Sequence, residues 1–160
     1  MAGRECIAAA GNSLERYLNH CFSQAQPLPE GNTQASLVRT EDLKDGLDAP
    51  AVSIFLYRVH FSQTMRAAWS GVASQDQRIH LPLDLHYLVT PWATNATYEQ
   101  LILGRVLECL EETPILGGPL LASSGNWSPG EAVQVCLEDL STEDVMRTFD
   151  SLPVLSLIHI

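Results

Sequence analysis

Two long strand patterns, at residues 51–61 and 79–89, constrain the fold of this chain more than any other feature. The first, AVSIFLYRVHF, is apolar on both alternating faces, which is typical of a central strand covered on both sides in at least its first half. The second, IHLPLDLHYLV, alternates apolar and polar residues and predicts a strand with one covered face. Pro82 cannot donate a hydrogen bond within a sheet, so we expect that end of the strand at an edge or a bulge.

Shorter patterns around these strands predict helices and further strands. Apolar residues recur at three- and four-residue steps in residues 4–22 and 95–112, which indicates two amphipathic helices. The other predictions are a short strand at 36–39, loops at 40–50 and 115–130, a hairpin arm or loop at 62–77, a strand at 132–137 and a last helix at 141–152. This order of elements predicts an α+β fold with a mostly antiparallel sheet and helices packed on it.

Helix ends and faces give more specific expectations. Asn95 or Thr97 can cap the helix at 95–112, and Ser141 with Asp144 resembles a capping box that opens the last helix. Gly104 lies inside a predicted helix, which suggests close packing against the sheet. The apolar stripe expected on that helix consists of Tyr98, Leu101, Ile102, Val106, Cys109 and Leu110.

Composition bounds the class of protein. The 160 residues are 46% hydrophobic and 18% charged, which fits one packed globular domain. The net charge of -10 argues against nucleic acid or an anionic membrane as a direct partner, because binding phosphate needs a basic face. We expect no signal peptide, and no apolar run approaches the roughly 20 residues that a membrane-spanning helix needs.

The cysteine pattern predicts free thiols. Cys6, Cys21, Cys109 and Cys136 form no CxxC pair. Cys6 and Cys21 fall in one predicted helix, where the usual rise separates them by about 22 Å, too far for a disulfide. We therefore expect buried thiols in a reducing compartment.

One pair of residues could carry chemistry. Asp84 and His86 are two residues apart on one strand, so their side chains share a face, with His80 further along it. A carboxylate beside an imidazole can orient a general base or bind a metal ion. The structural interpretation is favoured, because an alternating strand must place polar groups on its outer face. Adjacent residues on that face are already about 7 Å apart, so all three could not readily bind one ion.

No motif predicts a cofactor or a nucleophile. Ser123-Ser124-Gly125 lacks the GxSxG pattern of a nucleophile elbow, and no P-loop or dinucleotide fingerprint occurs. Glu108, Glu111 and Glu112 are interpreted as the solvated end of a helix. The prediction is a protein that is not an enzyme, with no catalytic residue, cofactor or metal.

Three tryptophans are candidates for a protein interface. Trp69, Trp92 and Trp127 all fall in predicted loops, where a core does not require aromatic residues. Tryptophan is enriched at protein interfaces. The alternative, that each indole folds back to cover a sheet edge, stays open.

The chain resembles the tail terminator, or cap, proteins of extracellular contractile injection systems of the Photorhabdus virulence cassette and antifeeding prophage type. The resemblance covers the N-terminal helix and nearly the whole chain up to about Val154. It lies in PAVSIFLYRV from Pro50, LPLDLHYLVT from Leu81, LILGRVLE from Leu101, PIL at 114–116, and residues 133–149. The combination of LYRV and LDLHYL at this separation is its most specific part.

The resemblance implies a structural role. It implies an α+β domain at residues 1–154, similar to phage tail terminators, that forms a homo-hexameric ring. Such a ring would stop growth of the inner tube and anchor the last ring of the contractile sheath, so sheath and tube proteins are the implied partners. The protein would be in the bacterial cytoplasm during assembly and then in a released extracellular particle.

The last six residues, LSLIHI at 155–160, match the translation of a transposon-end adapter used in sequencing libraries. We interpret them as an adapter-derived tail that replaces the native continuation after about Val154, because members of the family continue beyond this helix. A genuine apolar strand is the alternative.

Two other classes of function stay open. One is an adaptor or chaperone that binds tail components without remaining in the particle. The other, less favoured, is a small hydrolase or metal enzyme that uses Asp84 and His86.

Overall fold

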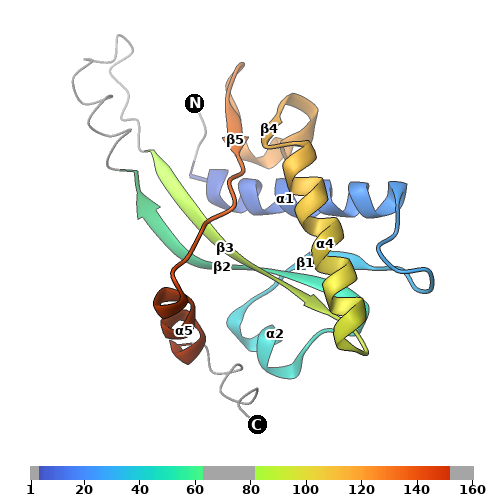
Figure 1. The fold of residues 1–160 in the computed structure, drawn as a ribbon. Helices are drawn as coiled ribbons and strands as arrows, with labels where there is room; N and C mark the ends of the chain where they lie inside the picture. Colours follow the sequence, from blue (N-terminus) through green and yellow to red (C-terminus); the bar gives the residue numbers. More distant parts are fainter. Residues whose placement is uncertain (1–3, 63–81, 152–160) are drawn as a thin grey trace.

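The structure, a computed structural model, describes residues 4–62 and 82–151 and is an α+β fold, as predicted. Its elements in chain order are α1 (Cys6–Gln24), β1 (Gln34–Leu37), α2 (Thr40–Asp45), β2 (Ala51–Phe61), β3 (Leu83–Trp92), α4 (Ala96–Glu112), β4 (Ile115–Gly117), the 3-10 helices Gly118–Leu120 and Ser123–Gly125, β5 (Ala132–Gln134) and α5 (Thr142–Ser151) (Figure 1). The hairpin arm or loop predicted at 62–77, Trp69, His80 and the segment at 155–160 lie outside the described residues, apart from Ser62.

A three-stranded sheet has β2 at its centre. β1 pairs with β2 in parallel, and β3 pairs with β2 antiparallel. A second, two-stranded sheet is formed by β4 and β5 in antiparallel pairing. The central position predicted for residues 51–61 is therefore confirmed.

The core lies over only the first half of β2. Val52 and Ile54 are fully buried there, and helices α1 and α4 contribute Leu18 and Ile102 to the same cluster. Beyond the core, β2 and β3 continue as a two-stranded arm, shown at the upper left of Figure 1, in which Phe61 is 51% exposed. The sequence pattern on β2 reflects this division, since its buried half carries no charged residue.

Helix α1 also closes the outer edge of β1. The Asn19 side chain accepts from the Ala35 N–H at 2.9 Å and donates to the Ala35 carbonyl at 2.8 Å. The carboxylate of Glu15 accepts from the Leu37 N–H at 3.2 Å. These side chains take the place of a fourth strand, so the edge of β1 is not free for pairing.

The region predicted as a loop at 40–50 contains a short helix, α2, so that prediction is wrong in its first half. Asp42 accepts from the Arg39 N–H at 2.7 Å, and its carboxylate also contacts the Arg39 guanidinium at 2.9 Å. The first of these contacts satisfies the main-chain N–H of Arg39 at the start of the helix. Gly46, with φ of 74°, ends it.

Helix α4 begins as predicted but packs differently. The Asn95 side chain accepts from the Tyr98 N–H at 2.9 Å, which confirms the cap. Leu101, placed in the apolar stripe, is 48% exposed. The close packing predicted at Gly104 is wrong, because a Cβ there would meet no atom within 4 Å. The helix rests on the core through Ile102, Val106, Cys109 and Leu110, and Tyr98 of the predicted stripe also packs against it.

Other boundaries differ by a few residues. β3 runs to Trp92, so the loop prediction for Trp92 is wrong; pairing with Ala51 continues the strand to this point. β5 ends at Gln134 rather than 137, since its partner β4 has only three residues. The cap of the last helix is confirmed, because Ser141 Oγ accepts from the Asp144 N–H at 3.2 Å.

The cysteines are only partly as predicted. Cys21 and Cys109 are buried free thiols, Cys6 is half-buried, and Cys136 is exposed. The expectation of four buried thiols is therefore wrong for Cys136. It lies past the end of β5, where the chain leaves the core.

Candidate functional site: the anchor between strap and arm

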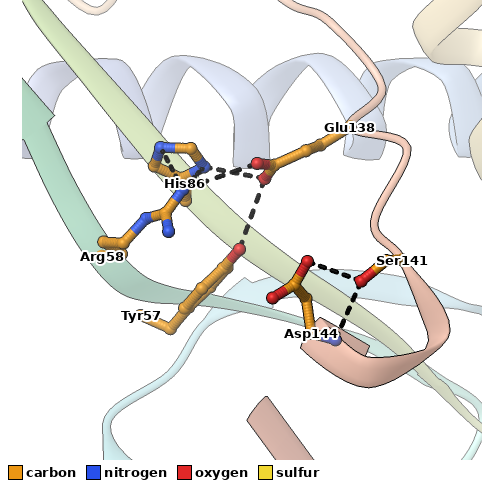
Figure 2. Close-up of polar contacts among 6 residues, drawn as sticks. All are labelled: Tyr57, Arg58, His86, Glu138, Ser141 and Asp144. Carbon is orange, nitrogen blue, oxygen red and sulfur yellow. Dashed lines mark hydrogen bonds and ion pairs between the residues drawn. The ribbon is translucent and has the colours of Figure 1, made fainter. Parts of the chain in front are cut away.

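The main cluster of interacting polar side chains on the sheet lies where residues 136–140, here called the strap, cross the arm formed by β2 and β3. The strap connects β5 to α5, and its Glu138 reaches three side chains on the arm, Tyr57, Arg58 and His86 (Figure 2). The register of β2 shifts between Leu56 and Arg58, so Tyr57 is an unpaired bulge residue. Bulges redirect side chains, and here the bulge lets Tyr57 and Arg58 both reach Glu138.

The cluster of Tyr57, Arg58, His86 and Glu138 is here called the anchor, and His86 lies at its centre. Its Nδ1 lies 2.8 Å from Glu138 Oε2, and its Nε2 lies 3.1 Å from Arg58 Nη2. A carboxylate can only accept and a guanidinium can only donate. Glu138 therefore accepts from His86 Nδ1, and Arg58 Nη2, which also lies 3.3 Å from Nδ1, contacts both ring nitrogens.

Two weaker contacts complete the anchor. The Tyr57 hydroxyl donates to Glu138 Oε2 at 3.4 Å, and Arg58 Nη2 lies 3.5 Å from Glu138 Oε1. Ser141 and Asp144, also drawn in Figure 2, are hydrogen-bonded to each other at the start of α5, shortly after Glu138 in the chain. The anchor thus fixes the strap just before the helix begins.

The environment shifts two pKa values. The hydrogen bond from His86 lowers the pKa of Glu138, helped by the charges of His86 and Arg58 and only partly opposed by desolvation. Burial raises the pKa of Tyr57, and the negative charge of Glu138 raises it further. Glu138 is consequently a carboxylate, and Tyr57 a neutral donor, over the whole neutral range.

The pair singled out in the sequence, Asp84 and His86, is not a unit in the structure. Asp84 lies opposite His60 in the ladder, and His86 lies opposite Arg58. The carboxylate that contacts His86 is Glu138, which is 52 residues away in sequence. Within residues 4–62 and 82–151, no three His, Cys, Asp or Glu side chains are grouped to hold a metal ion.

Sequence reasoning missed three of the four anchor residues. A signal for one of them is present: Gln134, Cys136 and Glu138 alternate with Val133, Val135 and Leu137, so Glu138 continues the polar side of a strand pattern. Nothing in the local sequence connects that position to Tyr57 or Arg58, because a bulge and a long-range crossing bring them together.

The two described tryptophans both use their indole N–H within the chain. Trp92 donates from Nε1 to Ser53 Oγ at 2.9 Å, and Trp127 donates from Nε1 to the Ala122 carbonyl at 2.7 Å. Trp127 also packs against the core. Each indole folds back onto the protein and is half-buried. An interface role for Trp69, Trp92 and Trp127 stays a prediction.

Fold and site together define a class of protein: an α+β domain whose sheet extends into an exposed arm, with a strap anchored across it. None of the helices within the described residues is long and apolar enough to span a membrane. The arrangement offers surfaces and edges for protein contacts, and its best-formed polar cluster ties two segments of the chain together.

The chain belongs to the Pvc16 N-terminal domain family, whose model matches residues 9–154. This membership associates the protein with virulence cassettes of the Photorhabdus type. The match includes the arm, the strap and α5. No curated protein is similar enough in sequence to match the chain.

Proposed function

We propose that this chain is the structural cap of a phage-tail-like contractile injection particle. In this role it forms a ring of six identical chains that ends growth of the inner tube and anchors the terminal ring of the sheath. The observation that carries the proposal is the match to the Pvc16 N-terminal domain over residues 9–154. The resemblance in sequence to cap proteins supports the cap role for this member of the family.

The fold supports the proposal through its surfaces. A ring needs surfaces that pair with neighbours, and the exposed arm offers both strand edges and apolar side chains such as Val59 and Phe61. The net charge of -10 suits sheath and tube proteins as partners better than nucleic acid or a membrane. In this proposal the protein is not an enzyme and is built into the particle in the bacterial cytoplasm before release.

Deleting the gene in a strain that makes the particles tests this role. Without a cap, we expect tubes and sheaths of variable length in electron micrographs, and complementation restores one length. Antibody labelling of intact particles should mark one end only. Unchanged particle length in the deletion strain would contradict the proposal.

The same preparation separates the cap from the adaptor or chaperone. An adaptor is required for assembly but is missing from purified, sheathed particles, whereas a cap remains at a fixed small number of copies per particle. Quantitative mass spectrometry of purified particles measures that number.

A further inference from the structure

In the half of β3 that lies beside the core, the main chain points N–H and C=O groups away from β2, where no described strand pairs with them. The Val38 N–H donates to the Ile54 carbonyl at 3.1 Å, so the main chain of Ile54 faces β1. Ile54 lies opposite Val89 in the ladder between β2 and β3. In an antiparallel pair, a residue that does not exchange hydrogen bonds with its opposite turns its N–H and C=O to the other side. The main-chain polar groups of Val89 therefore point away from β2. By alternation, so do those of Tyr87 and Pro91.

In the half of β3 that belongs to the arm, alternate residues also point their main-chain groups away from β2. The Ser62 N–H donates to the Pro82 carbonyl at 3.2 Å, so these two residues face each other. The next pair, Phe61 with Leu83, is then not hydrogen-bonded, and Leu83 and Leu85 face outward. Pro91 has no N–H to lose at this edge, as is usual for proline in an edge strand.

Among residues 4–62 and 82–151, no strand covers this edge, although side chains of α1 cover the edge of β1. The N–H groups of Leu83, Leu85, Tyr87 and Val89 all point outward from half-buried positions. An open strand of this length is a template for another strand.

The strap is a segment of strand-like sequence without a partner. The alternating pattern of β5 continues to Leu137, but its ladder ends at Gln134 and its last main-chain bond is from the Val135 N–H to the Pro114 carbonyl at 2.7 Å. From Cys136 to Leu140, the strap makes no main-chain hydrogen bond within the described parts of the chain. Leu137 is 57% exposed.

The anchor holds the strap in place without using its main chain. The polar contacts of Glu138 with the arm all use its carboxylate, and its neighbour Leu137 is exposed. The strap is thus held across its own arm, and its main chain is not hydrogen-bonded to any other described part of the chain. Fixing a segment in this way lowers the conformational entropy that it loses on binding.

We propose that the strap, residues 136–140, adds as a strand to the outer edge of β3 in a second copy of the chain. The donor and the acceptor are different surfaces, so the contact is heterologous, and repeated head to tail it closes into a ring when the rotation permits. Leu137 then lies beside the half-buried Leu83 and Leu85 of the neighbour's β3 and extends the apolar face on which Val59 is 47% and Phe61 51% exposed. Only the placement of this ring at the end of a particle rests on the proposed function.

A proline substitution on the acceptor edge tests the proposal. Leu85→Pro removes an outward N–H that makes no bond to β2, and Leu85→Ala keeps this N–H while removing the same side chain. We expect light scattering across a concentration series to show association of the unchanged chain and of Leu85→Ala. Leu85→Pro should raise the concentration needed for association at least tenfold. Equal association of the two variants overturns the proposal.

Two further variants protect this test against misfolding. Leu137→Pro alters the donor, outside any helix or strand, and should weaken association as strongly as Leu85→Pro, with Leu137→Ala as its control. Circular dichroism verifies that each variant keeps its fold. If Leu85→Pro unfolds, the comparison of the two Leu137 variants decides, and equal association of these two overturns the proposal.

Cross-linking identifies the two surfaces directly. One tagged chain keeps the exposed Cys136, and a second chain with another tag carries Leu85→Cys and Cys136→Ser. A short bismaleimide should join the two tags in the mixture. Replacing Leu85→Cys by Leu101→Cys, an exposed position on α4, gives the background. Cross-linking no greater than this background counts against the proposal.

The outcomes separate this inference from the proposed function. An unchanged chain that stays monomeric at all concentrations overturns the inference, while the cap role still stands if the protein is found at particle ends. Loss of association in both proline variants supports the inference even if the protein is missing from particles, a result that would overturn the cap role alone.

Discussion

Single residues determine how the strap is attached to the arm. Glu138 accepts from His86 at 2.8 Å and lies within reach of Tyr57 and Arg58, so one carboxylate links the bulge in β2, the neighbouring strand and the strap. Because its side chain is 41% exposed, water screens these contacts and the anchor is weak in energy. The effect of the anchor is to hold the strap in position on the arm.

We predict that Glu138→Gln lowers the free energy of unfolding by about 0.2–1 kcal/mol at neutral pH, the range of exposed charged pairs. The pKa of Glu138 is lowered in the folded protein. Its stabilising effect is therefore present above the ordinary glutamate pKa and is lost as the pH falls through the lowered value. Urea unfolding at several pH values measures this difference.

Asp139→Asn is the matched control, since this neighbouring carboxylate is exposed. The control should change stability little at any pH. A difference between Glu138→Gln and the unchanged chain that persists below the lowered pKa would contradict the role assigned to the carboxylate.

Two glycines should respond oppositely to alanine. A Cβ at Gly125 would overlap the indole of Trp127, whereas a Cβ at Gly104 meets nothing within 4 Å. We expect Gly125→Ala to destabilise by about 1–3 kcal/mol through overpacking. Gly104→Ala should stabilise by about 0.4–1 kcal/mol. Alanine fits the helical conformation at this position and leaves the unfolded chain fewer conformations to lose on folding. Thermal unfolding measures both, and equal effects would contradict this account.

Among the elements, α1 has two tasks. Its apolar face, with Leu14, Leu18 and Phe22, covers the sheet, and its polar residues Glu15 and Asn19 close the edge of β1. β3 has no such cover, so the two edges of one sheet differ in their capacity to pair. Beside the core, the outer edge of β3 is therefore the open edge of this sheet.

We predict that Asn19→Ala destabilises the chain by about 1–3 kcal/mol, because the N–H and C=O of the buried Ala35 lose their partners. His20→Ala, at the exposed neighbouring position, should stay within about 0.5 kcal/mol. Urea unfolding of both variants gives the comparison. A cost for Asn19→Ala no larger than that for His20→Ala would show that the edge of β1 is closed in another way.

For the whole molecule, charge and shape favour protein partners. The chain has 9 Lys and Arg against 19 Asp and Glu, and this net negative charge opposes phosphate binding. The arm extends from the core, as Figure 1 shows, and presents strand edges away from it.

We predict that the chain does not shift a DNA duplex in a native gel at physiological salt, at protein concentrations up to about 100 µM, where non-specific DNA binders do so. A basic DNA-binding protein on the same duplex serves as the positive control. A shift that weakens with added salt would contradict the prediction and reopen nucleic acid as a partner.

The sequence by itself determined the α+β class, the central β2, the alternation of β3 and the caps at Asn95 and Ser141. These features are local, since periodicity and capping depend on residues a few positions apart. It also determined the negative charge and the family.

Only the tertiary structure decided which surfaces stay uncovered. The exposure of Leu101, the true partner of His86 and the inward fold of Trp127 depend on contacts between distant segments, which no local pattern encodes. The same holds for the strap. Its strand pattern ends unpaired because β4 is too short to cover it, and its main chain is thereby left free beside an arm whose own edge is open.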